Sequence, residues 1–146
     1  MQAARVNFFY QDVKFSFSNR TELKGFLKKL FLKEGYKLSE LNIIFCTDEA
    51  LLQINRNFLQ HDFYTDIITF PLSTASQPIQ AELYISIDRV RDNARQVATS
   101  FKDELHRVIF HGCLHLAGYG DKSSQQIKKM REREDHYLRL YAKQLG

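Results

Sequence analysis

The segment that decides the fold is residues 111–121, which read His111-Gly112-Cys113-Leu114-His115-Leu116-Ala117-Gly118-Tyr119-Gly120-Asp121. The residues on both sides of its first histidine are apolar, which predicts a buried helix. Two histidines four positions apart on a helix are offset by about 40° and project from one face. The glycines that follow can end the helix in a sharp turn, which brings the carboxylate at the end of the segment back toward that face.

The side chains of His111, His115 and Asp121 are all ligand types that zinc accepts. Three protein ligands leave a fourth position for water, which is typical of a catalytic zinc site rather than a structural one. The alternative is a chance spacing of two core histidines. The apolar surroundings favour the metal site, because buried imidazoles need partners. Cys113 is not expected to be a ligand, since it lies two positions from each histidine and faces the other side of the helix.

The residue after the first histidine argues against one familiar class of metal enzyme. Zinc metallopeptidases with this histidine spacing carry a glutamate there, where it acts as the general base. This chain has Gly112 instead. A small metallopeptidase is therefore disfavoured, and either a base comes from elsewhere in the chain or the metal alone activates a water.

The pattern His-Gly-x-Leu-His-Leu-x-Gly-Tyr at residues 111–119 resembles the signature of the YbeY family. Members of that family are bacterial ribosomal-RNA maturation endoribonucleases with a single metal ion. Two further blocks resemble the family in order and spacing. They are residues 81–86, Ala81-Glu82-Leu83-Tyr84-Ile85-Ser86, and residues 54–71, Ile54-Asn55-Arg56-Asn57-Phe58-Leu59-Gln60-His61-Asp62-Phe63-Tyr64-Thr65-Asp66-Ile67-Ile68-Thr69-Phe70-Pro71. The resemblance covers most of the chain and implies one metal-dependent hydrolase domain over residues 1–146.

Two departures from the family pattern bear on the chemistry. The family signature continues with Asp-His, and that histidine is the third metal ligand, whereas this chain has Gly120-Asp121. The resemblance therefore assigns the third ligand to Asp121. A carboxylate there adds a negative charge, which should raise the pKa of a bound water and favour harder metals. The family also often has an arginine, thought to face RNA, where this chain has Leu59. Arg56 or His61 is expected to take over this RNA contact, unless the contact is absent.

The resemblance also implies a second carboxylate at the site. Glu82 stands where the family has the aspartate of a Gly-Asp-Ile block, and it is expected to orient the attacking water or to hydrogen-bond a ligand histidine. The alternative is a strand-end charge that faces solvent. Asp66 precedes a predicted strand and is expected to line the same cleft. It could equally be a turn residue whose side chain bonds its own backbone.

Length and composition agree with this interpretation without proving it. The chain has 146 residues, which suits one domain with a substantial core, and 21 Lys and Arg against 17 Asp and Glu give a net charge of +4. This mild basic excess is compatible with a nucleic-acid partner. Cys46 and Cys113 are expected to be buried thiols in a reducing cytosol. No apolar leader or bilayer-length segment is visible, so we expect a cytoplasmic protein without membrane contact.

Periodicity and capping residues predict the order β, α, β, α, β, β, followed by three helices. We expect one or two strands within 5–17 and further strands at 41–46, 67–72 and 82–87. Helices are expected at 21–33, 48–57 and 88–97, and from Asp103 and Ser123 onward, with Asp88 as a cap. This order predicts an α+β fold with helices packed on a mixed sheet of about four strands, as a single pair of layers.

Three features outside the motif are expected to be structural. The last helix alternates charge over residues 128–135, which favours a solvated face, with RNA contact as the alternative. His136 lies within that charged helix. His106 points about 140° away from His111 on its own helix. Neither histidine is expected to bind the metal. The sequence also contains no nucleophile elbow, Walker loop or dinucleotide fingerprint.

The resulting hypothesis is a zinc-dependent endoribonuclease specific for single strands, which acts in ribosomal-RNA maturation and ribosome quality control. Its expected partners are single-stranded RNA, chiefly ribosomal RNA, and ribosomal particles or ribosome assembly proteins. The alternative is a non-catalytic assembly factor that binds RNA and uses the metal for stability. The mild basic excess, Leu59 and Asp121 leave room for this alternative.

Overall fold

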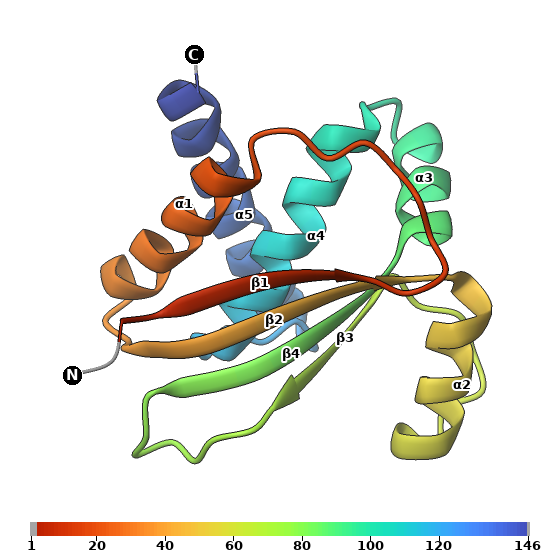
Figure 1. The fold of residues 1–146 in the computed structure, drawn as a ribbon, viewed down its shortest axis with the longest axis horizontal. Helices are drawn as coiled ribbons and strands as arrows, with labels where there is room; N and C mark the ends of the chain where they lie inside the picture. The colour runs from red at the N-terminus through yellow and green to blue at the C-terminus, as the bar shows by residue number, and fades with distance from the viewer. Residues whose placement is uncertain (1–2, 146) are drawn as a thin grey trace.

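The computed structural model describes residues 3–145 and has the predicted order of elements (Figure 1). The strands are β1 (Arg5–Tyr10), β2 (Leu38–Cys46), β3 (Ile67–Pro71) and β4 (Ile79–Ser86). The helices are α1 (Arg20–Lys33), α2 (Asp48–Leu59), α3 (Ile87–Gln96), α4 (Phe101–Leu116) and α5 (Ser124–Leu145). The predicted α+β fold on a mixed sheet is confirmed.

The four strands form one sheet in the order β1-β2-β4-β3. Strand β2 runs parallel to both of its neighbours, while β3 is antiparallel to β4. Successive side chains of a strand point to opposite faces. In β4, Leu83 and Ile85 therefore face the main core, which also contains residues of α1, α3, α4 and α5, whereas Tyr84 faces a smaller cluster.

Helix α2 lies on the opposite face of the sheet from α1, α4 and α5 (Figure 1). Its apolar side needs a cover, and Leu51 packs there against Cys46 and Ile68 in the smaller cluster. The expected single pair of layers, a sheet covered by helices, describes most of the fold, and α2 adds a partial third layer on the other face of the sheet.

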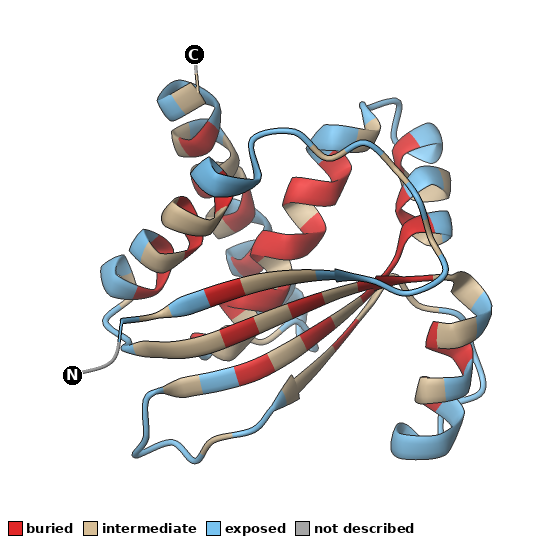
Figure 2. Ribbon diagram, viewed as in Figure 1, coloured by how far each residue is buried: buried red, intermediate tan, exposed pale blue. Residues whose placement is uncertain are grey.

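Helix α4 runs through the main core, and buried residues gather along it and in the middle of the strands (Figure 2). Gly112 lets this helix lie close to the sheet. A Cβ atom at this position would lie 2.7 Å from Cδ1 of Ile67 and 3.0 Å from Cδ1 of Leu83. The side chain of a glutamate would therefore meet the sheet, which explains why the general base of the metallopeptidases has no counterpart here.

Only one strand forms within residues 5–17, where one or two were expected. After β1 the chain is irregular, because the aromatic residues that gave the alternating pattern pack on the core instead of pairing with a strand. The rings of Phe15 and Phe17 meet that of Phe45 edge-on, at 5.1 Å and 5.6 Å between centroids.

Two helix starts also differ from the expectation. Helix α3 is capped by Ser86 rather than Asp88, since Ser86 Oγ accepts a hydrogen bond from the backbone N–H of Arg89. Helix α4 begins before Asp103, because Ser100 Oγ accepts from the backbone N–H of Asp103. In both cases the acidic residue lies in the first turn of the helix, where its negative charge interacts favourably with the positive end of the helix dipole. Between residues 3 and 145, no helix combines the length and apolar character needed to cross a membrane.

Candidate metal centre

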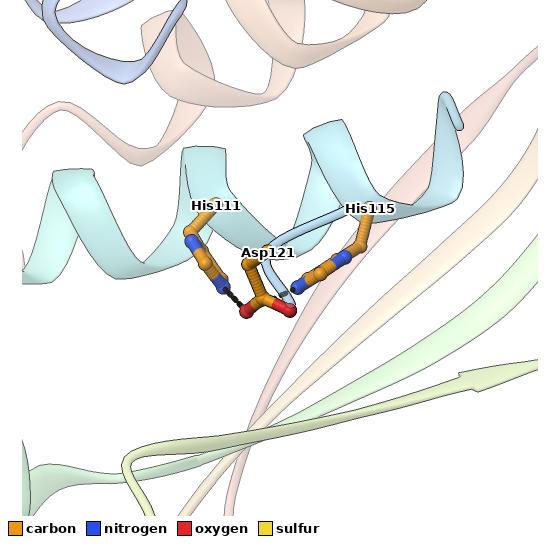
Figure 3. Close-up of side chains that lie close together, drawn as sticks. All are labelled: His111, His115 and Asp121. Atoms are coloured by element: carbon orange, nitrogen blue, oxygen red, sulfur yellow. Dashed lines mark hydrogen bonds and ion pairs between the residues drawn. The ribbon is translucent and has the colours of Figure 1, made fainter. Parts of the chain in front are cut away.

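The structure brings together the three side chains that the sequence singled out (Figure 3). His111 and His115 project from one face of α4, with ring centroids 4.5 Å apart. Asp121 returns from the following turn, and its Oδ2 lies 3.4 Å from Nε2 of His111 and 3.1 Å from Nε2 of His115. Within the described residues, these three supply donor atoms that all lie within 4.8 Å of one another.

Both imidazole rings are held from behind by hydrogen-bond acceptors. Nδ1 of His111 lies 2.7 Å from Oε2 of Glu134, and Nδ1 of His115 lies 2.9 Å from the carbonyl oxygen of Tyr119. These acceptors assign the proton of each neutral ring to Nδ1, so both Nε2 lone pairs face Asp121. Either an additional proton or a metal cation must then lie among the three facing atoms. Two imidazoles and a carboxylate oxygen are a donor set that fits zinc.

Glu134 is the buried anion of this site. It lies on α5 with 3% of its surface exposed, and it also accepts hydrogen bonds from Arg107 and Arg131 at 2.9 Å and 3.1 Å. Burial alone raises the pKa of Glu134, but the hydrogen bonds from His111 and Arg107 outweigh burial and leave its pKa lowered. Burial likewise lowers the pKa of His111, and the adjacent Glu134 reverses this shift and leaves it raised.

The turn that carries Asp121 is anchored to the end of α1. Gly118 adopts φ +99°, a conformation that favours glycine, and lets the chain leave α4 sharply. The hydroxyl of Tyr119 then donates to Oε1 of Glu34 at 2.7 Å, while Arg133 binds Oε2 of the same carboxylate at 2.6 Å. The turn is therefore fixed through Tyr119 to two other helices.

A cleft of about 1010 Å³ opens beside the metal centre. Its wall includes His111, His115 and Asp121. Among the residues that line it within 3–145, Lys122 is the only lysine or arginine. The other polar and aromatic lining residues include Tyr36, Asn55, His61, Phe63, Thr65 and Asp66.

Asp66 lies in this cleft, as the sequence predicted. The backbone N–H groups of Asp66 and Ile67 lower the pKa of its carboxylate, which fits the alternative of a turn residue whose side chain faces its own backbone. Oδ2 of Asp66 lies 3.4 Å from Nδ2 of Asn93 on α3. Burial raises the pKa of Asp66, although the charge of His111 opposes this shift.

The prediction that Glu82 serves the metal centre is wrong. Leu83 contacts α4 at Gly112, so Glu82, its neighbour in β4, points to the opposite face of the sheet. There Oε1 of Glu82 accepts a hydrogen bond from the hydroxyl of Tyr84 at 3.2 Å. The resemblance of residues 81–86 to the family block was misleading, because it does not show which face of β4 contacts α4.

The two proposed RNA contacts lie in different places. Arg56 is exposed and paired with Asp62, and it is not part of the cleft wall. His61 is exposed on the loop after α2 and lines the cleft, where its ring stacks on Phe63 at 5.1 Å between centroids. Leu59 lies on the same wall and is 41% exposed.

The other histidine and cysteine expectations agree with the structure. His106 is buried and packs against Phe110 and Tyr141, and His136 lies on α5 beside Tyr137; neither joins the metal group. Cys46 and Cys113 are both buried free thiols. The expectation of a solvated last helix was wrong at one position, because Glu134 is buried.

Comparisons with known proteins agree with the motifs. The family model described as "Endoribonuclease YbeY" matches residues 6–142. A protein named "Endoribonuclease YbeY" from Cytophaga hutchinsonii is 48% identical over 140 residues, 96% of this chain and 98% of that protein. One of the same name from Bacteroides thetaiotaomicron is 40% identical, over 92% of this chain and 98% of the other. A solution structure from Thermotoga maritima has TM-score 0.67 and 26% identity, and the match covers 96% of this chain and 91% of that one.

Proposed function

We propose, since this chain belongs to the YbeY family of endoribonucleases, that it is a zinc-dependent hydrolase that cuts single-stranded RNA. Residues 1–146 act as one domain in this proposal. The observation that carries it is the convergence of His111, His115 and Asp121 at the wall of an open cleft, with each imidazole oriented by an acceptor on its far side.

His111 and His115 would hold zinc through Nε2, and Asp121 would hold it through a carboxylate oxygen. When bound, zinc polarises a phosphodiester oxygen and lowers the pKa of a water molecule. Glu134 and the carbonyl of Tyr119 keep both imidazoles in the orientation that binding requires. Asp66 faces the same cleft and offers a carboxylate that orients the attacking water.

The size of the cleft supports a preference for single strands. A flexible strand can enter a cleft of about 1010 Å³ on a small protein, whereas a duplex holds its phosphates in a wide, rigid helix. The stacked rings of His61 and Phe63 provide an aromatic surface on which an unpaired base can lie. His61 thus serves the RNA through stacking, while Arg56 attracts the strand from outside the cleft.

Ribosomal RNA is the proposed natural substrate, and ribosomal particles or assembly proteins in the cytoplasm are the proposed partners. The support for this part is the resemblance to a family that acts in ribosomal-RNA maturation. In that role the enzyme removes unpaired segments from precursor or defective ribosomal RNA.

A second function is favoured by the weak positive charge of the cleft. Lys122 is the only lysine or arginine on its wall within residues 3–145, Arg56 is engaged by Asp62, and Leu59 offers no charge. A ribosome assembly factor that binds RNA without cutting it, and uses the metal for stability, fits these observations.

One experiment separates the two functions. The protein is purified without added zinc, its metal content is measured, and a single-stranded RNA and its duplex are offered with and without a chelator. The proposed enzyme cuts the single strand in preference, loses activity in the chelator, and loses it equally in His115→Ala. RNA binding by metal-loaded protein without any cleavage, even of assembled ribosomal particles, would establish the assembly factor.

A further inference from the structure

Three clefts adjoin one another along α4, and Asp66 lines all of them. The first is the cleft at the metal centre. A middle cleft of about 380 Å³ shares His111 and Asp121 with it. A third cleft of about 1090 Å³, here called the distal cleft, shares Glu104 and Arg107 with the middle one. The three clefts are therefore neighbours, and they follow one another along α4 from the metal centre to the distal cleft.

Glu104 lies on the same face of α4 as the first metal ligand. It precedes His111 by seven residues, or two helical turns, which offsets the two side chains by about 20° around the axis and about 10 Å along it. A strand whose phosphate lies at the metal centre can therefore continue along the helix to Glu104.

Glu104 is a largely buried residue whose carboxylate has no side-chain partner within residues 3–145. Only 9% of its surface is exposed, and neither a hydrogen bond nor an ion pair joins it to another side chain in the part of the chain described, residues 3–145. Burial raises the pKa of Glu104. Its carboxylate oxygens line the distal cleft and are not fully enclosed by protein, so they can accept a hydrogen bond from a bound molecule.

The lining of the distal cleft also carries positive side chains, next to the exposed carboxylate of Asp103. Lys102 and Arg139 are exposed there and form no ion pair within residues 3–145. Arg131 also lines the cleft, with 61% of its side chain exposed. Arg107 is engaged by Glu134 and Asp135 and contributes little free charge.

We propose that the distal cleft binds a nucleotide of the RNA strand beyond the scissile phosphate, with Glu104 accepting a hydrogen bond from that nucleotide. The phosphate stays at Lys102 and Arg139, because the buried carboxylate repels it. The group that reaches Glu104 must be an N–H of the base or the 2′-hydroxyl of the ribose, which are the donors of an unpaired ribonucleotide. This inference rests on the proposed action on single-stranded RNA.

The test measures binding in a chelator, so that cleavage does not intervene. Short fluorescent single-stranded RNAs are varied in base, and separately in the 2′-hydroxyl, at each position in turn, and affinity is read by anisotropy. Wild-type protein should discriminate by about fivefold or more at one position. Glu104→Gln should reduce that preference to about twofold or less and leave the other positions unchanged. Glu132→Gln, on an exposed carboxylate outside the three clefts, is the matched control and should behave as wild type.

The two series of RNAs identify the donor. Loss of a base preference assigns it to the base, and loss of sensitivity to 2′-deoxy substitution assigns it to the ribose. Arg139→Gln should lower the affinity for every RNA alike, because a phosphate contact carries no sequence information. The same preferences in wild type and Glu104→Gln, or no preference in wild type, would overturn the inference.

Cleavage assays with zinc separate this inference from the proposed function. If the protein cuts RNA but the Glu104→Gln variant keeps all the binding preferences of wild type, the proposed function stands and the inference about Glu104 is wrong. If the protein shows the Glu104-dependent preference but cuts no RNA, the inference about Glu104 stands and the proposed catalytic function is wrong. Wild-type protein that binds none of these RNAs contradicts both.

Discussion

Glu134 on α5 lies 2.7 Å from Nδ1 of His111 on α4, so a carboxylate from the last helix orients one of the three side chains proposed to bind the metal. The same carboxylate is fixed by Arg107 at 2.9 Å, one turn before His111 on α4. The orientation of His111 therefore depends on how α5 packs against α4, and not on the motif alone.

Glu134→Gln should weaken zinc binding by about 10- to 100-fold, the range typical of residues that orient a ligand histidine. The amide has one acceptor oxygen and no charge, so it holds the Nδ1 proton of His111 less firmly. Competition with a zinc-binding dye measures the change. Asp135→Asn is the control, since Asp135 pairs with Arg107 but not with His111. Equal affinities in wild type and Glu134→Gln would show that α5 does not support the site.

Asp121→Ala should weaken zinc binding by more than about 100-fold, because loss of a direct ligand should exceed the effect of losing a supporting residue. Asp121→His should retain binding, since an imidazole is also a zinc ligand. Elemental analysis after dialysis against a weak chelator measures both, with Glu132→Ala as the control on an exposed acidic residue. Tight zinc binding by Asp121→Ala would mean that another residue completes the site.

Tyr119→Phe should lower the free energy of unfolding by about 1 kcal/mol, the typical value of one hydrogen bond. It removes the bond to Glu34 and leaves that buried acceptor with fewer donors. Zinc affinity should fall as well, because the carbonyl of Tyr119 orients His115. Urea denaturation and dye competition measure the two effects. Tyr10→Phe, which removes an exposed hydroxyl, should change neither the free energy of unfolding nor the zinc affinity. If Tyr119→Phe has the same two values as Tyr10→Phe, the hydroxyl of Tyr119 does not anchor the turn.

Stability should fall as the pH drops from about 6.5 to about 4 because of His106. Burial lowers the pKa of His106 from 6.5 to about 4, and the nearby Lys102 adds to this shift. The unfolded chain takes up the proton first, so the stabilisation is complete above pH 6.5 and is lost as the pH falls through this window. The full difference corresponds to about 3 kcal/mol.

Denaturation of metal-free protein across this pH range tests the effect in wild type and His106→Leu. The difference in the free energy of unfolding between wild type and His106→Leu separates the effect of His106 from that of other titrating groups. These include His111, whose raised pKa acts in the opposite direction. Parallel stability curves for the two proteins over pH 4–6.5 would contradict the assignment.

The sequence predicted the order of elements because helix and strand periods and serine or threonine caps are local signals. The start of α4 was predicted at Asp103, whereas the helix begins at Phe101. Ser100 and Asp103 both suit a helix start, and only the structure shows that the serine oxygen accepts the backbone N–H of the aspartate. The position of α2 on the second face depends on contacts between distant segments, which no local signal states.

The site was predictable where its residues lie within one motif and was not where it depends on packing. His111, His115 and Asp121 lie within eleven consecutive residues. Glu134 was missed because alternating charges around it indicated a solvated face. A signal was present, since the buried residues of α5 recur at helical spacing and Glu134 occupies one of those positions: Met130, Glu134, Tyr137 and Tyr141.

The central claim is that one zinc ion bound by His111, His115 and Asp121 is required for the cleavage of single-stranded RNA. The most direct measurement adds zinc stepwise to metal-free protein and follows bound zinc and the initial cleavage rate in the same samples. The account predicts that the rate rises in proportion to bound zinc and levels off at about one equivalent, with no rise in His115→Ala. A full cleavage rate in metal-free protein would contradict it.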